Sequence, residues 1–511
     1  MLQRIKDTLE VYKRPQALRM LFLGFSAGLP ILLIFSSLSL WLREAGVQRS
    51  AVTFFSWAAL GYSFKFVWAP LVDKIPLPVL TAKLGKRRDW LLLSQIFIIL
   101  AILGMAFTDP VLGDQSLTRM ALFAVLLGFS SATQDISVDA YRIESDTVEN
   151  QAALSATYIG GYRIGMIIAG AGALKLASFL GSTKEVYSYS AWMWTYAFMA
   201  LMMLVGVATT LIVPKPEHTV ESKYNYKNSE YFRFFIFFLI SISVFVSAFF
   251  FSSDMAKELK ESMNSFVIES GRLIAAIVGS VIAATVLLKL GIVNRQMVNE
   301  TYVAPVKEFF SRYQVSLAIL LLALVGLYRI SDIVLGVISN VFYQDLGFNK
   351  DQIANIVQIF GVIMTLVGVF IGGVVTKKFG VMKILFVGAL LSAGTNLLFM
   401  LLASMGKSLP MLYLVISADN LAAGLASAAF IAFLSGLTNI SFTAVQYAIF
   451  SSLMTLFPKF LGGYSGTMVD SIGYSNFFLV TTLLGVPVLF LVMLAGKKLK
   501  LKEESEEANA G

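Results

Sequence analysis

Apolar segments of about 20 residues recur along the whole chain, separated by short polar loops. Each is long enough to cross the ~30 Å hydrocarbon core of a bilayer as an α-helix. They lack the alternation of polar and apolar residues that membrane β-strands have, as residues 96–107 illustrate. The pattern therefore predicts an all-α membrane protein. Fourteen transmembrane helices are expected, at residues 17–41, 51–72, 90–108, 119–141, 152–180, 188–213, 231–252, 272–293, 314–343, 352–376, 381–404, 410–437, 442–469 and 474–496.

Composition agrees with a membrane protein. Of 511 residues, 57% are hydrophobic and 14% are charged, against roughly 25% charged residues in soluble domains. The chain has no cysteine, and its one histidine, His218, lies in a polar linker. Disulfides and thiolate metal sites are therefore excluded, and we expect no metal site, no cofactor and no enzymatic activity.

The net charge of +9 is concentrated in particular loops. Lys and Arg gather in the N-terminal tail, in the loop after the second span, in the loop around residue 380, and after the last span. They are Arg4, Lys6, Lys13, Arg14, Lys74, Lys83, Lys86, Arg87, Arg88, Lys377, Lys378, Lys383, Lys497, Lys498, Lys500 and Lys502. Because cytoplasmic loops are enriched in these residues, both termini are expected in the cytoplasm. The charge then reflects membrane orientation, and we expect no nucleic-acid partner.

The first and second parts of the chain also resemble each other in sequence. Residues 41–47 after the first span are similar to residues 342–348 after the ninth, and a basic turn follows both the second and the tenth span. Duplicated halves are typical of secondary transporters. We therefore predict two six-helix halves with an inserted helix pair. The boundaries are 1–213 for the N-terminal half, 214–313 for a linker with two extra spans, 314–496 for the C-terminal half, and 497–511 for a cytoplasmic tail.

Charged residues inside the spans are candidates for transport chemistry, because each costs about 2.5–3.5 kcal/mol to insert. Candidates for substrate binding and proton coupling lie in both halves. With two neighbouring amides they are Lys65, Gln134, Asp135, Arg163, Arg329, Asp332, Asp419, Asn420 and Lys459. Asp419 and Lys459 are the expected counterparts of Asp135 and Arg163.

The fourth span carries the most informative pattern. Asp135 and Asp139 are four residues apart, so they share one helical face, which Arg142 continues. Two close carboxylates raise each other's proton affinity, which suits a proton carrier. Alternatively, Asp139 and Arg142 form a structural gate at the cytoplasmic mouth. We assign Asp135 to the site and Asp139 to the gate.

The fifth span combines a small-residue ridge with one arginine. Gly161, Gly165, Ala169 and Ala173 follow one another at four-residue spacing, which lets a neighbouring helix approach closely. Arg163 points to another face, where its guanidinium suits a carboxylate of the substrate or of Asp135.

The loop after the second span predicts a conformational latch. Asp73 ends that span, and Arg87 and Arg88 follow in a basic turn. An acidic helix end beside a basic loop can hold helices together on the cytoplasmic side. A purely topogenic role for the basic residues is the alternative, and the two are compatible.

Several ordered motifs resemble the AmpG-type muropeptide permeases of the major facilitator superfamily. They are GFSAGLP at 24–30, FKFVWAPLVD at 64–73, GKRRDWLL at 85–92, ATQDI at 132–136, GYRIGM at 161–166, YRISD at 328–332, DNL at 419–421 and QYA at 446–448. The resemblance covers both halves. It implies the major facilitator fold and proton-coupled symport of 1,6-anhydro-muropeptides (GlcNAc-1,6-anhydroMurNAc and its peptides) through the bacterial inner membrane.

The same resemblance implies a role in peptidoglycan recycling and in β-lactamase induction. Gln134 and Asn420 would then bind sugar groups, and Arg163, Lys65 or Lys459 would bind peptide carboxylates. We expect a monomer with a small-molecule substrate, protons and lipid as partners. There are two alternatives. One is a transporter of another large anion such as acetyl-CoA, whose carriers share a related pattern in the fourth span. The other is a muropeptide sensor without transport.

Overall fold

The computed structural model describes Tyr12, residues 14–47, Tyr62, and residues 64–183, 186–216, 226–259, 265–348, 352–462 and 464–510. Within those residues the regular structure is helical, and no strand is present. The chain divides into two compact units. The first contains Met1–Val72, Pro76–Thr219 and Tyr313–Gly511, and the second contains Asp73–Ile75 and Val220–Arg312.

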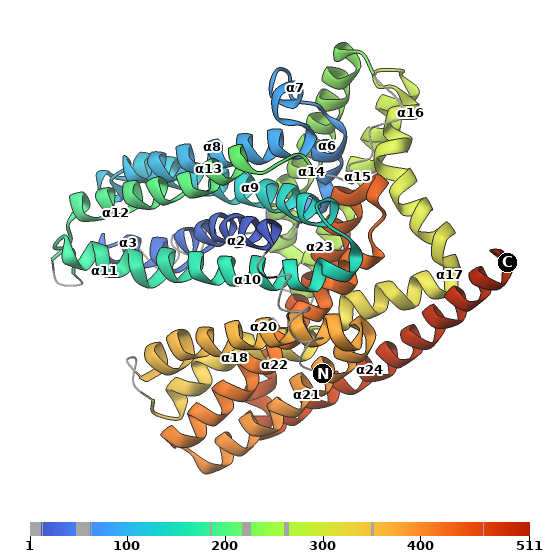
Figure 1. Ribbon diagram of the computed structural model, residues 1–511. Helices are drawn as coiled ribbons and strands as arrows, with labels where there is room; N and C mark the ends of the chain where they lie inside the picture. The colour runs from blue at the N-terminus through green and yellow to red at the C-terminus, as the bar shows by residue number, and fades with distance from the viewer. Residues whose placement is uncertain are drawn as a thin grey trace. The chain divides into compact units, whose positions relative to one another are not determined.

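The N-terminal half of the first unit is a group of helices (Figure 1, blue to green). They are α2 (Pro15–Ile34), α3 (Ser36–Glu44), α8 (Lys86–Ala106), α9 (Asp114–Glu144), α10 (Gln151–Ile167), α11 (Ala173–Phe179), α12 (Tyr189–Met202) and α13 (Leu204–Ile212). A π-helical turn, η6 (Ile168–Gly172), joins α10 to α11. The predicted span 51–72 lies largely outside the described residues; its last part is the short η3 (Lys65–Val67) and α6 (Ala69–Lys74), and α7 (Leu80–Leu84) follows.

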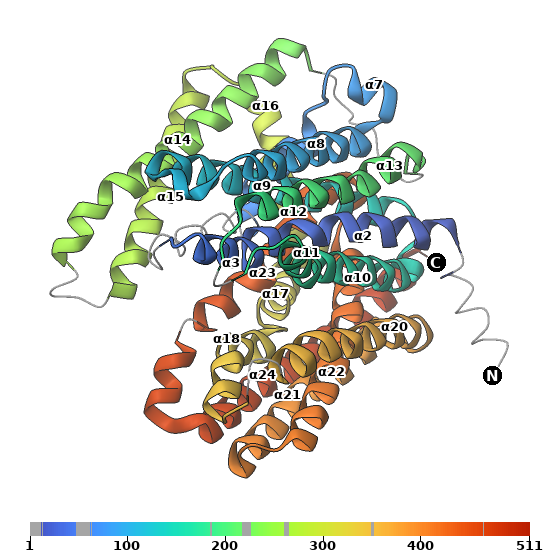
Figure 2. The same cartoon turned by 90° about the vertical axis from the view of Figure 1, so that its left-hand side faces the viewer.

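The C-terminal half forms a second group (Figures 1 and 2, yellow to red). Its helices are the end of α17 (Ala304–Leu327), α18 (Ile330–Asp345), η8 (Ile353–Phe360) with α20 (Gly361–Phe379), α21 (Val381–Met405), α22 (Leu409–Leu437), α23 (Thr443–Gly462) and α24 (Ser465–Ala510). Helical geometry breaks at Gln314 in α17 and at Gly473 in α24, where φ is 59° and 74°. The last helix continues through the predicted tail.

The second unit is built on a helix pair, α14 (Asn228–Leu259) and α15 (Ser265–Lys289), which pack along each other. The Ser280 hydroxyl donates to the Ser241 carbonyl at 2.8 Å. At one end Lys74 pairs with Glu300 at 2.9 Å, and Tyr226 donates to the same carboxylate. These contacts join the short segment 73–75 to the residues that flank the helix pair, Tyr226 before α14 and Glu300 after α15.

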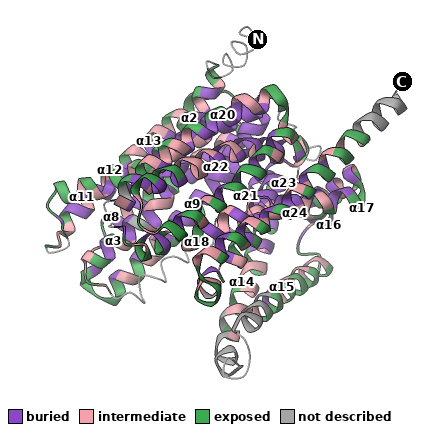
Figure 3. Cartoon of the chain, turned by 90° about the horizontal axis from the view of Figure 1, so that it is seen from below, coloured by how far each residue is buried: buried purple, intermediate pink, exposed green. Residues whose placement is uncertain are grey.

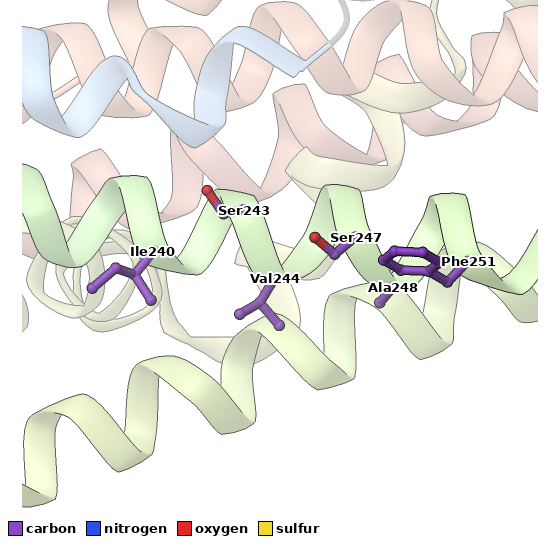
Figure 4. A pocket seen from close by; sticks show the side chains of 6 residues that line it. All are labelled: Ile240, Ser243, Val244, Ser247, Ala248 and Phe251. Atoms are coloured by element: carbon purple, nitrogen blue, oxygen red, sulfur yellow. The ribbon is translucent and has the colours of Figure 1, made fainter.

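A shallow depression lies on α14 (Figure 4). Its volume is about 420 Å³, and it is lined by Ile240, Ser243, Val244, Ser247, Ala248 and Phe251. All of these residues come from one helix, and none is charged. The depression therefore lacks the ionisable groups on which the sequence-based site rests.

Eleven helices within the described residues are long and apolar enough to cross a membrane, against fourteen expected. The difference has three parts. Span 51–72 is mostly outside the described residues, span 152–180 is helical but carries Arg163 and Lys175, and span 272–293 contributes a shorter apolar helix, Ile274–Lys289. The predicted membrane class is confirmed, whereas the number fourteen is not.

Glycines bring helix backbones into direct contact in both halves. On α2 and α10, a Cβ added to Gly24 would lie 2.1 Å from the Tyr158 carbonyl oxygen, and one added to Gly161 would lie 1.8 Å from that of Leu21. On α20 and α22, a Cβ at Gly368 would lie 2.3 Å from the Leu421 oxygen. No side chain fits at such distances, so these glycines set the helix spacing.

Burial follows the same arrangement (Figure 3). Buried residues line the faces where helices meet, while large apolar side chains such as Leu122, Trp194 and Ile282 are exposed. In a soluble protein such apolar exposure would be unfavourable, but in a bilayer these side chains contact lipid tails. The structure is thus that of a multi-pass membrane protein.

Candidate functional site

The two carboxylates of α9 lie one helical turn apart and differ in their contacts. Asp135 is 8% exposed, and its Oδ1 has no hydrogen-bond partner among the described residues. The charged groups that act on it are Lys65 and Asp139. Asp139 is paired directly, since its Oδ2 lies 3.5 Å from Lys65 Nζ. The predicted residues Lys65, Asp135 and Asp139 are therefore together in the structure.

Arg142 continues this chain of charges to the C-terminal half. Its Nη2 lies 3.5 Å from Asp139 Oδ1, and its side chain is fully buried. Its Nη1 donates to Gln151 and Ser155 at 3.0 and 3.1 Å, and to Ser435 of α22 at 2.8 Å. The guanidinium also stacks 5.2 Å from the centre of the Tyr447 ring on α23. One arginine thus joins both halves.

Arg87 and Arg88 have separate contacts. Arg87 makes a buried ion pair with Glu144 at the end of α9, with Nη2 2.6 Å from Oε1. Arg88 donates to the carbonyls of Thr210 and Leu211 at the end of α13, where a cation is favoured by the helix dipole. Asp73 is buried at 7% exposure and belongs to the second unit. Its predicted role in the latch stays a prediction.

Further contacts between the halves lie near these residues. Lys377 of α20 donates to Asn150 at 3.0 Å, and Asn150 donates to Asp146, which also pairs with Arg14 at 3.9 Å. The Tyr12 hydroxyl donates to the Phe370 carbonyl at 3.4 Å.

We call this region, which carries Arg14, Arg87, Arg88 and Lys377, the basic end. The halves touch each other there, through Arg142, Lys377 and Tyr12.

The C-terminal half has its own acidic cluster. Asp332 on α18 lies 3.9 Å from Arg329 and accepts from Ser392 at 3.4 Å. Asp419 on α22 accepts from Thr395 at 3.3 Å, and the charges of Asp332 and Arg329 act on it. Arg329, Asp332 and Asp419, which were predicted separately, therefore form one group.

The two predicted amides are engaged in contacts between and within helices. Gln134 is fully buried and donates to the Ser26 carbonyl of α2 at 3.2 Å. Asn420 accepts from Thr365 of α20 at 2.8 Å and donates to the carbonyl of Ile416 at 3.0 Å. Their predicted role in sugar binding stays a prediction, and the structure gives each a packing role.

Arg163 and Lys459 lie apart from the other candidates. Arg163 donates to the sulfur of Met166 at 3.9 Å, and the charge of Arg329 acts on it. Among the described residues, Arg163 forms no ion pair with Asp135. The cation beside the two carboxylates of α9 is Lys65, which pairs with Asp139. Lys459 is exposed near the end of α23, one residue after Pro458.

Comparison with known proteins identifies the family. The model described as Major Facilitator Superfamily matches residues 20–333 and 320–510. A curated relative, putative transporter AmpG 4 of Rickettsia felis, is 31% identical over 96% of this chain and 99% of its own. The anhydromuropeptide permease of Escherichia coli strain K12 is 27% identical over 96% of this chain and 82% of its own.

The chain belongs to the AmpG group of the Major Facilitator Superfamily.

Solved structures agree on the fold. The proton:xylose symporter XylE is 14% identical, with a TM-score of 0.57 over 94% of both chains. The transporter FucP in an outward conformation is 10% identical, with a TM-score of 0.59 over 95% of this chain and 99% of its own. The predicted major facilitator fold and the resemblance to AmpG-type proteins are both confirmed.

In this member of the superfamily, the two halves repeat a polar contact that the sequence analysis missed. In the first half, Thr210 of α13 donates to Gln95 of α8 at 2.9 Å. In the second, Asn396 of α21 donates to Thr481 of α24 at 3.1 Å. Both link the third helix of a half to the sixth. In the sequence, the signal for these contacts was an uncharged amide, Gln95 or Asn396, within an apolar span.

Glu144, Ser435 and Tyr447 were also missed. Glu144 follows Asp139 by five residues in the same helix, three residues beyond the predicted span, so its charge was a visible signal. Ser435 and Tyr447 are ordinary residues in sequence, and only the approach of α22 and α23 to α9 gives them a role.

Proposed function

We propose that this chain is a proton-coupled importer of 1,6-anhydro-muropeptides. The observation that supports this substrate is the near full-length similarity to the anhydromuropeptide permease of Escherichia coli. The charged groups within the spans are consistent with a large polar cargo bearing carboxylates. Import would serve peptidoglycan recycling and β-lactamase induction, and the cargo crosses without chemical change, so the chain is not an enzyme.

The proposed location is the bacterial inner membrane, with both termini in the cytoplasm. The basic end carries Arg14, Arg88 and Lys377, which supports a cytoplasmic position because cytoplasmic loops attract Lys and Arg. Since the halves touch at that end, the conformation is one that is closed toward the cytoplasm. A single chain with duplicated halves is sufficient for alternating access.

Asp135 is the proposed proton carrier. It is nearly buried, and Oδ1 lacks a donor among the described residues, so a proton bound there would satisfy that oxygen. The proton is taken from the periplasmic side and released when the cavity opens to the cytoplasm. Asp139 pairs with both Lys65 and Arg142, and the charges of Lys65 and Asp139 act on Asp135, so a change of charge at Asp135 reaches the group that holds the gate.

Arg142 is the proposed centre of the cytoplasmic gate. Opening that end separates its guanidinium from Ser435 and Tyr447, while Gln151 and Ser155 stay on its own half. Protonation of Asp135 reduces the negative charge around Lys65 and Asp139. The ion pairs of Asp139 then rearrange, which changes how firmly Arg142 is held.

Uptake of labelled GlcNAc-1,6-anhydroMurNAc into proteoliposomes with an imposed proton gradient tests the proposal. Accumulation that collapses when the gradient is dissipated is the expected result. Binding without accumulation would identify a sensor instead. Uptake of labelled acetyl-CoA but not of the disaccharide would identify the other kind of carrier, and either result would contradict the proposal.

A further inference from the structure

Two arginines in the spans, Arg163 and Arg329, make only long polar contacts among the described residues. Arg87 and Arg142 have close carboxylate or hydroxyl partners, at 2.6 Å for Arg87 and 2.8 Å for Arg142. By contrast, the hydrogen bond given for Arg163 goes to a sulfur at 3.9 Å, and the ion pair of Arg329 is 3.9 Å long. Charge-assisted hydrogen bonds are normally about 2.7–2.9 Å. A guanidinium has five N–H groups, so both side chains retain free capacity.

Arg163 lies on the face of α10 that is turned toward the C-terminal half. Ala156 on that face packs with Val369 of α20 and Ala428 of α22. One turn later, a Cβ added to Gly160 would lie 3.6 Å from the Phe370 ring of α20. Arg163 follows these residues by seven and three positions, so it continues the same face.

Arg329 approaches from the other half. It immediately precedes α18, and its neighbour Tyr328 stacks on Phe430 of α22 with ring centres 4.3 Å apart. Its side chain is 30% exposed. Its charge acts on Arg163, so the two guanidinium groups lie within electrostatic reach of each other.

The charges around this pair are unevenly distributed. Asp332 and Asp419 lie on the side of Arg329, and the charge of Arg329 acts on both. Arg163 has no carboxylate within 4.0 Å among the described residues, and the like-charged Arg329 acts on it. Within a membrane protein such an unpaired cation is unfavourable, and an anionic ligand between the two would remove the repulsion.

We propose that Arg163 and Arg329 together form a carboxylate-binding site between the two halves. The ligand class follows from the donors, since planar guanidinium groups bind carboxylates in a bidentate manner. This inference rests on the proposed function, and it assigns the peptide part of a muropeptide to this pair. A bound carboxylate would bridge the halves, and its absence would leave two cations opposed.

Binding to the purified protein in nanodiscs tests the site. The probes are a GlcNAc-1,6-anhydroMurNAc-peptide with free peptide carboxylates and the same molecule with those carboxylates amidated. In the unaltered protein, amidation should weaken binding about tenfold or more, as expected for a lost charge-assisted contact. In Arg163→Gln and in Arg329→Gln, amidation should change the affinity by less than about twofold, because the partner is already gone.

Two further variants serve as controls. Lys175→Gln removes an exposed cation from the same span, and it should keep the full effect of amidation. Arg163→Lys keeps the charge but not the planar fork, and it should give an intermediate effect. Size-exclusion profiles and thermal melting verify that each variant is folded before binding is measured.

The outcomes separate the two proposals. If the unaltered protein binds neither probe, the proposed function fails. If it binds both equally, or if amidation still weakens binding tenfold in Arg163→Gln and Arg329→Gln, the carboxylate site is wrong while muropeptide binding stands.

Discussion

The two halves contain similar polar residues in different surroundings. In the N-terminal half, Asp139 pairs with Lys65 and Arg142, while one oxygen of Asp135, one turn away, has no donor in the part of the chain that the structure describes. In the C-terminal half, Asp332 and Asp419 each accept from a hydroxyl, and the charge of Arg329 acts on both. The residue types are similar, but the contacts differ. We propose that the first half transmits a change of charge, whereas the second holds its acidic groups.

The largest expected effect distinguishes the two sets of carboxylates. Asp135→Asn should reduce gradient-driven accumulation about 100-fold or more, because it removes the proposed proton carrier. Asp419→Asn should cost less than about tenfold, because Thr395 still donates to the amide oxygen. Uptake in proteoliposomes measures both. Equal losses would mean that the halves share the proton function.

The ion pair between Arg87 and Glu144 is expected to dominate stability at the basic end. Glu144→Gln should lower the free energy of unfolding by about 3–5 kcal/mol, since it removes the carboxylate charge that faces the buried guanidinium of Arg87. Thermal melting in detergent measures this. Replacing both residues by apolar ones of similar size should restore much of the loss. A melting temperature unchanged by Glu144→Gln would show that Arg87 has another sufficient partner.

Glycine contacts offer a matched test in each half. Gly161→Ala should destabilise the protein by about 1–3 kcal/mol, whereas Gly160→Ala should be nearly neutral, because the nearest atom is 3.6 Å away. In the other half, Gly368→Ala should destabilise and Gly394→Ala should not, as nothing lies within 4 Å of the latter. Melting temperatures of the four variants decide the point. Equal shifts within a pair would contradict the packing described above.

The smallest expected effect concerns the gate. Ser435→Ala removes the hydrogen bond that Arg142 donates across the halves at 2.8 Å. The closed state should lose about 1.5 kcal/mol, roughly a tenfold change in the ratio of closed to open molecules. Distances between spin labels at the basic end report that ratio. A shift toward the closed state would argue against the gate.

Much of the fold followed from hydrophobic length, because apolar runs near 20 residues have one stable form in a bilayer. The number of transmembrane helices did not follow from length alone. Residues 152–180 are long enough to span the membrane, but Arg163 and Lys175 make the segment less apolar. The glycine ridge was predictable from four-residue spacing, since only close helix packing needs it.

The site was partly predictable. Asp135, Asp139 and Arg142 share a face of one helix, so spacing alone places them together. The partners of Arg87 and Arg142 could not be predicted, because they come from helices that are distant in sequence. A sequence does not show which of several carboxylates lies nearest to an arginine. Gln134 and Asn420 illustrate another limit, since an amide suits sugar binding and helix packing equally.

The central claim is that inward movement of the substrate carries a proton through Asp135. Liposomes loaded with a pH-sensitive dye, without an imposed gradient, test it directly. Adding GlcNAc-1,6-anhydroMurNAc outside should acidify the lumen of liposomes that contain the unaltered protein, and those with Asp135→Asn should show no change. Substrate entry without acidification, or equal acidification in the variant, would contradict the claim.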